Sequence, residues 1–376
     1  PEYRQTALEV ARQAMVLLKN QGGVLPVDLG KVRKLALIGP LADDHHEILG
    51  TWYRIGRDED SESVLDGLRA SLPASVNLRY VKGCELEAPG QDGFEEAIAA
   101  ARQSDLAVLV LGEGEYMSGE AHSRAFLSLP GEQQALLEAV YATGTPVIVV
   151  LMCGRPLVIP WLAEQIPAIL CAWHSGIRTG QAVADLLLGV ANPSAKLTAS
   201  WPRAEGQIPV YYNAKSTGRP AEGEGTYQFD KRHRAKFLDL DHRPLYPFGF
   251  GLSYTEIEYT DLEIEQPQLG AVDTLEVHVT LHNRGPRAGA EIIQLYVRDL
   301  VRSITPPVKE LKAFDKVYLE AGESRRVTLQ VPVERLGFHD LHLQYRVETG
   351  EFELWVGPNS AEGLQAEFVV NPIQPR

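Results

Sequence analysis

Residues 105–111 read D-L-A-V-L-V-L, and this stretch decides the fold class of the first half of the chain. The uninterrupted apolar run after the aspartate is typical of a central parallel strand that is covered on both faces. Shorter apolar runs of the same kind predict strands at residues 34–38, 78–81, 146–151 and 168–173. Helical periodicity separates the runs at residues 63–72, 92–103, 131–143 and 179–188, and more briefly near Trp161. Strands that alternate with helices predict an α/β sandwich on a mainly parallel sheet.

The chain opens on a further helical pattern. Its apolar residues share one face over residues 6–20, and Gly22 and Gly23 follow, so we expect a helix over residues 6–20. We assign residues 1–30 to this opening helix and a linker, and residues 31–205 to the α/β sandwich domain. The chain lacks an initiator Met and runs directly into the helix, so we expect its first residue not to be the natural start.

Towards the end of the chain the apolar period becomes two. Leu275, Val277, Val279 and Leu281 alternate with polar residues, and an Asn-Arg-Gly turn follows. Further short strands are expected at residues 291–297, 325–331 and 351–356. About 120 residues of short strands match the size of an immunoglobulin or fibronectin type III domain. Residues 255–376 are therefore assigned to a fibronectin type III-like β-sandwich, and the fold class is α/β plus all-β.

A long loop or linker is expected between the two domains, at residues 206–254. It is rich in Pro, Gly and Tyr, and loops of this length are usually functional or disordered. Its aromatic residues favour an ordered loop: Tyr211, Tyr212, Tyr227, Phe229, Phe237, Tyr246, Phe248 and Phe250. We interpret the last two as core residues rather than site residues.

Composition and charge argue against several classes of function. With 36 basic and 50 acidic residues the net charge is −14, which repels nucleic-acid phosphates and anionic membranes. No run approaches the roughly 20 apolar residues of a membrane-spanning helix. Two of the three cysteines lie in or beside apolar runs, so we interpret the cysteines as buried thiols. His45, His46 and His174 fit no metal-ligand spacing, and we predict neither a metal nor a cofactor.

The loop behind the central strand carries the candidate chemistry. Residues 112–133 read G-E-G-E-Y-M-S-G-E-A-H-S-R-A-F-L-S-L-P-G-E-Q. Ligands of open α/β sheets bind at the carboxyl ends of the strands, where this loop begins. Glycosidic cleavage needs one carboxylic acid to protonate the leaving oxygen and a second carboxylate as nucleophile or base. Glu120 is the leading candidate for the acid, although an ordinary solvated surface carboxylate is the default interpretation of a Glu on a polar loop.

Three other residues of this loop are candidates for a supporting role or a place near the substrate. Glu113 is the second candidate for the acid, and its position next to the strand end also suits an anchor of the loop backbone. Arg124 is interpreted as a salt-bridge partner that shapes the loop, in preference to a substrate contact. Together with Met117, these residues are predicted to support the site or to lie near the substrate.

The same loop resembles a known family. Written as G-E-x-x-x-M-x-G-E-A-x-S-R-x-x-L-x-L-P-G-x-Q, it is similar to the acid/base loop of the β-glucosidases of glycoside hydrolase family 3. Other segments agree with this family in order: A-M-V-L-L-K-N at 14–20, V-L-P at 24–26, A-L-I-G-P-L-A-D at 36–43, V-I-V-V-L-M-C-G-R-P-L at 147–157, A-V-A-D-L-L-L-G-V-A-N-P-S-A-K-L at 182–197, T-G-R-P at 217–220 and P-L-Y-P-F-G-F-G-L-S-Y-T at 244–255. The resemblance spans essentially the whole chain.

This resemblance implies the same fold as the periodicity, and a retaining double displacement in which Glu120 is the general acid/base. The family's nucleophile is an Asp on a (β/α)8 barrel that precedes these domains and is not present in this chain. Retaining catalysis needs the two carboxyl groups about 5–5.5 Å apart, so we expect the chain alone to be inactive. The implied function is the C-terminal part of a β-glucosidase that hydrolyses terminal non-reducing β-D-glucosyl residues of oligosaccharides. Its implied partners are the substrate and the barrel, and a homodimer is compatible with the family.

Alternative functions stay open at this point. One is β-xylosidase specificity, and another is a noncatalytic carbohydrate-binding or scaffold module of the same fold. A nucleotide-binding protein is suggested only by an Ile-Gly-Pro at residues 38–40, without either phosphate-binding glycine motif. The long loop, over residues 207–249, is as well suited to approach the sugar or the barrel as to pack between domains. The resemblance favours a periplasmic or secreted location over a cytoplasmic one.

Overall fold

The computed structural model describes residues 2–221 and 233–372, which fall into two compact units. Unit 1 consists of Pro1–Ala195, Pro202–Gly206 and Leu252–Tyr254. Unit 2 consists of Lys196–Trp201, Gln207–Gly251 and Thr255–Arg376. The domain boundaries proposed from the sequence, after residues 205 and 254, fall where the chain passes repeatedly between the two units.

Unit 1 is built on a six-stranded sheet with the strand order β1-β6-β5-β4-β2-β3. Its strands are β1 Val16–Asn20, β2 Lys34–Ile38, β3 Asn77–Val81, β4 Leu106–Gly112, β5 Val147–Met152 and β6 Ala168–Cys171. All neighbouring pairs are parallel except β1 and β6, which are antiparallel. Every residue of β4 and β5 is buried, as the uniform apolar run predicts for central strands.

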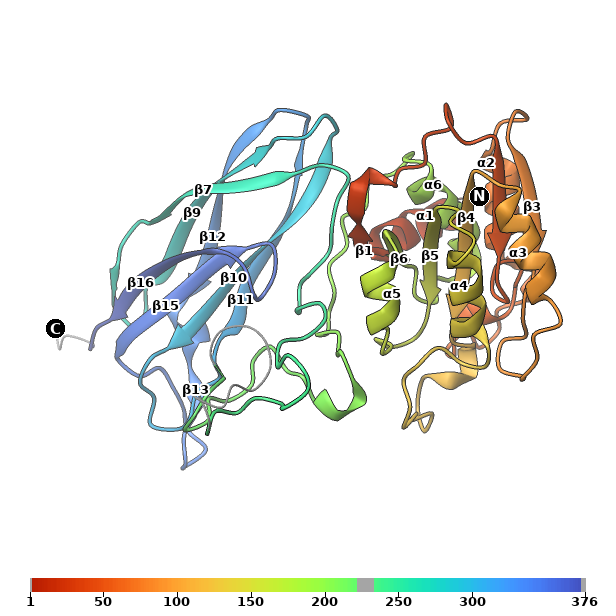
Figure 1. Cartoon of the computed structure of the whole chain (residues 1–376). Coiled ribbons are helices and arrows are strands. Elements are labelled where there is room, and N and C mark those ends of the chain that lie inside the picture. Colours follow the sequence, from red (N-terminus) through yellow and green to blue (C-terminus); the bar gives the residue numbers. More distant parts are fainter. Residues whose placement is uncertain (1, 222–232, 373–376) are drawn as a thin grey trace. The chain divides into compact units, whose positions relative to one another are not determined.

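Helices cover both faces of this sheet, as Figure 1 shows. They are α1 Glu2–Ala14, α2 Val64–Ser71, α3 Phe94–Arg102, α4 Gln133–Tyr141, α5 Pro160–Gln165 and α6 Thr179–Leu187. Helix α6 packs against α1 and α2, and α3 packs against α4. The predicted α/β fold class is therefore confirmed, and the predicted helices after residue 60 are each present within two residues of their expected bounds.

The helix predicted over residues 6–20 is wrong in its second half. Helix α1 ends at Ala14, and Val16–Asn20 forms β1. The apolar run at residues 15–18 is buried on every side, because β1 pairs with β6 and Leu17 also bridges Leu252. A short continuous apolar run fits a buried strand as well as a helical face, and here the open sheet edge decides between them. The strand predicted over residues 168–173 likewise ends early, at Cys171, and Trp173 takes a left-handed φ of 55°.

The order of the strands places a switch point in unit 1. From β2 the chain adds β3 on one side, and it then returns to add β4 on the other side of β2. The loops that leave β2 and β4 therefore diverge from the carboxyl ends of these two neighbouring strands. In open α/β folds this is the position at which ligands bind.

Unit 2 is a β-sandwich, which confirms the predicted all-β part of the fold. A five-stranded sheet has the order β11-β10-β15-β16-β8, and a three-stranded sheet has the order β12-β9-β7. The strands are β7 Ile257–Ile264, β8 Gln268–Leu269, β9 Thr274–Asn283, β10 Gly289–Asp299, β11 Glu310–Leu319, β12 Ser324–Pro332, β15 Gly350–Gly357 and β16 Leu364–Val370, with a small hairpin of β13 Phe338–His339 and β14 Tyr345–Arg346. The alternating apolar residues of β9 face a core shared by both sheets.

Aromatic residues of the long loop pack on one another within unit 2. Tyr212 stacks on Phe248 with ring centroids 4.3 Å apart, and Tyr246 stacks on Phe250 at 5.1 Å. These contacts support the packing role expected for the two phenylalanines. Of the aromatic residues on which the ordered loop was predicted, Tyr227 and Phe229 lie outside the described residues.

The interpretation of the cysteines as buried thiols is confirmed. The three cysteines are buried and unpaired, and the Sγ atoms of Cys153 and Cys171 lie 4.0 Å apart. Among the helices of the described residues, none combines the length and the apolar character needed to cross a membrane.

Candidate active site

A buried glutamine fixes the point where β4 ends and the candidate loop begins. The Gln133 side chain accepts the N–H of Gly112 at 2.8 Å and donates to the carbonyl oxygen of Gly112 at 2.9 Å. It also donates to the carbonyl oxygen of Leu86 at 2.9 Å. Gly112 has a φ of 146°, and a Cβ there would lie 1.7 Å from the carbonyl oxygen of Met152. Only glycine allows this close approach of the two strand ends.

Glu113 follows directly and is fully buried. Its Oε1 lies 2.7 Å from Nη1 of Arg124 and 3.4 Å from Nε of Arg155. Its N–H donates to the carbonyl oxygen of Met152, which extends the ladder between β4 and β5 by one residue. This burial supports the anchoring role considered for Glu113. The ion pair also agrees with the interpretation of Arg124 as a salt-bridge partner that shapes the loop.

Glu120 stands at the tip of a tight turn. The N–H of His122 donates to the carbonyl oxygen of Gly119 at 3.3 Å, and Ala121 takes a left-handed φ of 63°. A left-handed third residue is the signature of a type II turn. The Glu120 side chain is exposed, and within the described residues it makes no hydrogen bond and no ion pair. The fold thus presents one carboxyl group to solvent, available to a ligand.

An arginine that the sequence analysis did not single out reaches this turn from β5. Nη2 of Arg155 donates to the carbonyl oxygen of His122 at 2.7 Å and to that of Met117. Arg155 belongs to the segment that leaves β5, the neighbour of β4. Its distance from the loop in the sequence hides this contact, although it lies within one of the segments that resemble the family.

The segment that leaves β2 supports the start of the same loop. Oε2 of Glu47 accepts the N–H of Glu115 at 2.6 Å. The hydroxyl group of Thr51 lies against the carbonyl oxygens of Glu115 and Ser118. Burial raises the pKa of Glu47, and the hydrogen bond from Glu115 opposes that shift. Neither Glu47 nor Thr51 carries a sequence signal of its own, because only the sheet order brings them to the loop.

His174 completes the support from the β6 side. Its Nε2 lies 3.1 Å from the carbonyl oxygen of Glu113. Burial lowers the pKa of His174, so the neutral ring with its proton on Nε2 is the form that donates this bond. The ring of His174 is therefore hydrogen-bonded within the fold.

A shallow hollow of about 300 Å³ lies beside the turn. It is lined by Glu87, Tyr116, Met117, His122, Ser123, Arg124 and Pro130. Met117 and Arg124, predicted to support the site or to lie near the substrate, are thus both at this surface. Glu113 does not reach it, because it is fully buried.

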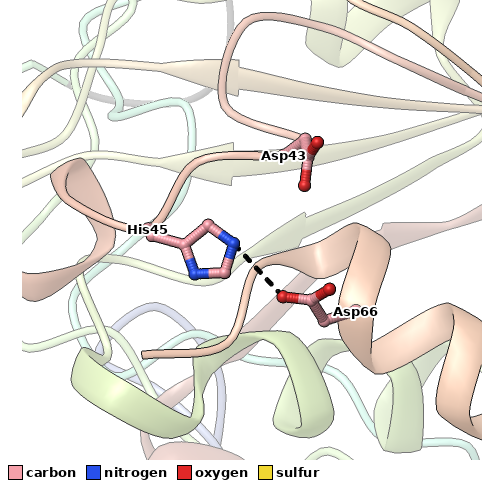
Figure 2. Close-up of side chains that lie close together, drawn as sticks. All are labelled: Asp43, His45 and Asp66. Atoms are coloured by element: carbon pink, nitrogen blue, oxygen red, sulfur yellow. Dashed lines mark ion pairs between the residues drawn. The ribbon is translucent and has the colours of Figure 1, made fainter. Parts of the chain in front are cut away.

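A second cluster of polar groups lies at the carboxyl end of β2. Figure 2 shows His45 facing Asp66, with Asp43 nearby, and the ligand-type atoms of the three residues all lie within 4.8 Å of one another. Nε2 of His45 is 3.3 Å from Oδ2 of Asp66. Asp66 forms a capping box with Ser63 at the start of α2, and Ser63 also donates to Asp43. The spacing of residues around His45 predicts no metal site. The fold brings two carboxylates close to His45, and both accept hydrogen bonds at the start of α2.

Two known domain families match the chain. The model described as the glycosyl hydrolase family 3 C-terminal domain matches residues 15–254. The model of the fibronectin type III-like domain matches residues 291–360. These two matches follow the order of the α/β and all-β parts.

Individual relatives are similar over nearly the whole chain. A β-xylosidase of Formosa agariphila is 40% identical over 366 residues, which cover 96% of this chain and 49% of that protein. A periplasmic β-glucosidase of Salmonella typhimurium is 38% identical, with 97% and 50% covered. The crystal structure of a β-glucosidase from Listeria innocua in complex with glucose superimposes with a TM-score of 0.91 at 38% identity, covering 98% of this chain and 50% of that chain. The chain therefore spans about half the length of the relatives it matches.

Proposed function

Because the chain belongs to glycosyl hydrolase family 3, we propose that it is the C-terminal part of a retaining β-glucosidase in which Glu120 is the general acid/base. The observation that carries this proposal is the placement of Glu120. Its carboxyl group is exposed and unengaged within the described residues, on a turn that the partly buried side chains of Arg155 and Thr51 support, in the loop that leaves β4 at the switch point of the sheet. A solvated surface carboxylate would need no such support.

The proposed reaction has two steps. In the first, the carboxylic acid of Glu120 protonates the glycosidic oxygen while a carboxylate nucleophile attacks the anomeric carbon. In the second, the Glu120 carboxylate takes a proton from water, which then displaces the sugar from the nucleophile. The exposed position of Glu120 suits both steps, since the same oxygen must reach the leaving group and then the water.

The nucleophile is proposed to lie outside this chain, as an Asp on a (β/α)8 barrel of the same enzyme. The half-length match to the relatives supports this division. The two carboxyl groups of a retaining enzyme lie about 5–5.5 Å apart, so the barrel must dock over the turn that carries Glu120. Without it this chain is proposed to be inactive.

The proposed substrates are oligosaccharides with a terminal non-reducing β-D-glucosyl residue. The names of the Salmonella and Listeria relatives support glucosides. A β-xyloside is the second candidate, because the Formosa relative is named a β-xylosidase at 40% identity. The name of the Salmonella relative also supports a periplasmic location, which we propose for this protein.

The test compares leaving groups in the complete enzyme. Glu120→Ala should lower kcat/KM for cellobiose by about 10²- to 10⁴-fold, the usual contribution of general acid catalysis. For an activated aryl glucoside, whose leaving group needs little protonation, the loss in kcat/KM should be far smaller. Equal losses on both substrates, or none on either, would remove Glu120 from this role.

A further inference from the structure

We infer that Arg155 is a positioning residue for the acid/base, which it holds in place through the backbone of the turn that carries Glu120. The inference rests on the function proposed above for Glu120. Nothing in the sequence pattern of the loop points to Arg155, since it leaves a different strand.

The Glu120 side chain depends on its own backbone for its position. Within the described residues no partner holds its carboxyl group, so the position of that group depends on the backbone of residues 119–122. Proton transfer needs the donor within about 0.5 Å of its productive position. A turn at the surface of the chain keeps such precision only if its two ends are fixed.

Arg155 fixes both ends with one atom. Its Nη2 donates to the carbonyl oxygen of Met117 before the turn and to that of His122 at its end. Met117 precedes Glu120 in the chain and His122 follows it, yet their carbonyl oxygens accept from the same guanidinium nitrogen. A planar, permanently charged donor group is well suited to hold such a pair.

Arg155 is itself ion-paired with a buried carboxylate. Its Nε lies 3.4 Å from Oε1 of Glu113, which is fully buried at the end of β4. The preceding Gly154 touches the loop as well, because a Cβ there would lie 1.9 Å from Oγ of Ser118. Glu113 at the end of β4 thus balances the charge of Arg155. Arg155, which follows β5, holds the turn that carries Glu120.

Arg124 shares Glu113 but has a different task. Its Nη1 pairs with Glu113 and its Nη2 donates to the carbonyl oxygen of Ser128, which lies beyond the turn. Removal of Arg155 therefore leaves Glu113 paired with Arg124 rather than as an uncompensated buried charge. For this reason we expect Arg155→Ala to fold.

A double-mutant cycle in the complete enzyme tests the inference. Arg155→Ala should lower kcat/KM for cellobiose at least about tenfold more than for an activated aryl glucoside, which repeats the signature of lost acid catalysis. In a Glu120→Ala background the same substitution should lower kcat/KM for cellobiose less than about threefold, because the effects of two residues that act as a unit are not additive. Equal losses on both substrates, or full additivity, would overturn the inference.

The controls separate positioning from stability. Arg12→Ala removes an ion pair with Asp185 in the same unit, and the Arg12 side chain is 21% exposed against 22% for Arg155. It should alter neither the leaving-group dependence nor the effect of Glu120→Ala. Arg155→Lys keeps the charge but loses the planar donor, so its kcat/KM for cellobiose should lie between the values of the wild type and Arg155→Ala. If Glu120→Ala itself shows no leaving-group dependence, the proposed function fails, whatever Arg155 does.

Hydrogen exchange on the 376-residue chain gives a readout that needs no activity. The amides of Met117 and His122 donate within the loop, to the carbonyl oxygens of Gly114 and Gly119. Arg155→Ala should speed exchange at these two amides several-fold while the amides of β4 keep their protection. Arg12→Ala should leave both regions unchanged. Unaltered exchange at the amides of Met117 and His122 in Arg155→Ala would contradict the positioning role of Arg155.

Discussion

The side chain of Gln133 satisfies both backbone polar groups of Gly112, accepting its N–H at 2.8 Å and donating to its carbonyl oxygen at 2.9 Å. This pair lies at the end of β4, where the sheet stops and the candidate loop starts. Because Gln133 is fully buried, water does not substitute for it. The loop therefore starts from a fixed point rather than from a frayed strand end.

Gln133→Ala should destabilise the chain by about 3 kcal/mol, because it leaves the buried backbone groups of Gly112 and the partly buried carbonyl group of Leu86 without their partner. Urea unfolding of the chain measures the change. The matched control is Gln134→Ala, which removes only a hydrogen bond to Glu138 at the surface. The control should stay within about 0.5 kcal/mol of the wild type. Similar losses for the two variants would show that the buried bonds do not matter.

The stability of unit 1 should fall at mildly acidic pH because of His174. Burial lowers its pKa below the ordinary 6.5, so the folded state resists a proton that the unfolded state accepts. The contribution of the neutral ring is present above pH 6.5 and is lost as the pH falls through the lowered pKa. The Tm of the wild type should fall between pH 7.5 and pH 5. In His174→Gln the fall in Tm over the same pH range should be smaller.

The control for this pH dependence is His342→Gln, at an exposed position in unit 2. It should keep the full decrease in Tm of the wild type. An equal decrease in the wild type and in His174→Gln would show that protonation of His174 does not govern the acid side of the stability curve.

The isolated chain should neither hydrolyse nor bind simple sugars. The nucleophile is proposed to lie on a separate barrel, and the hollow of about 300 Å³ beside the turn that carries Glu120 is shallow. Calorimetry of the 376-residue chain with glucose and cellobiose should therefore give no heat of binding at millimolar sugar. A dissociation constant in the micromolar range would favour a noncatalytic carbohydrate-binding module instead.

Much of the fold follows from local pattern. The uniformly apolar run of β4 predicts a buried central strand, and the strict alternation in β9 predicts a strand with one buried face. The opening segment shows where pattern fails. Its apolar residues at 15–18 fit a helical face and a buried strand equally well, and only the free edge of β6 makes them a strand.

The site was predictable only in part, for a related reason. Glu120 stands in a distinctive loop, and resemblance to a family points to it directly. Its supports are Glu47, Arg155 and His174, which come from the ends of β2, β5 and β6. Their proximity depends on the strand order, and the local apolar pattern of a sequence does not predict which strands are neighbours. The repeated passage of the chain between the two units around residues 195–255 likewise leaves no local pattern in the sequence.

Azide rescue of Glu120→Ala in the complete enzyme is the decisive experiment for the role of Glu120. In a retaining enzyme without its acid/base, an activated aryl glucoside still forms the glycosyl-enzyme, and azide can displace the sugar without base assistance. If Glu120 is the acid/base, azide should speed turnover of this variant, and the product should be β-glucosyl azide. No response to azide, or formation of the α-azide, would contradict the assignment of Glu120 as the acid/base.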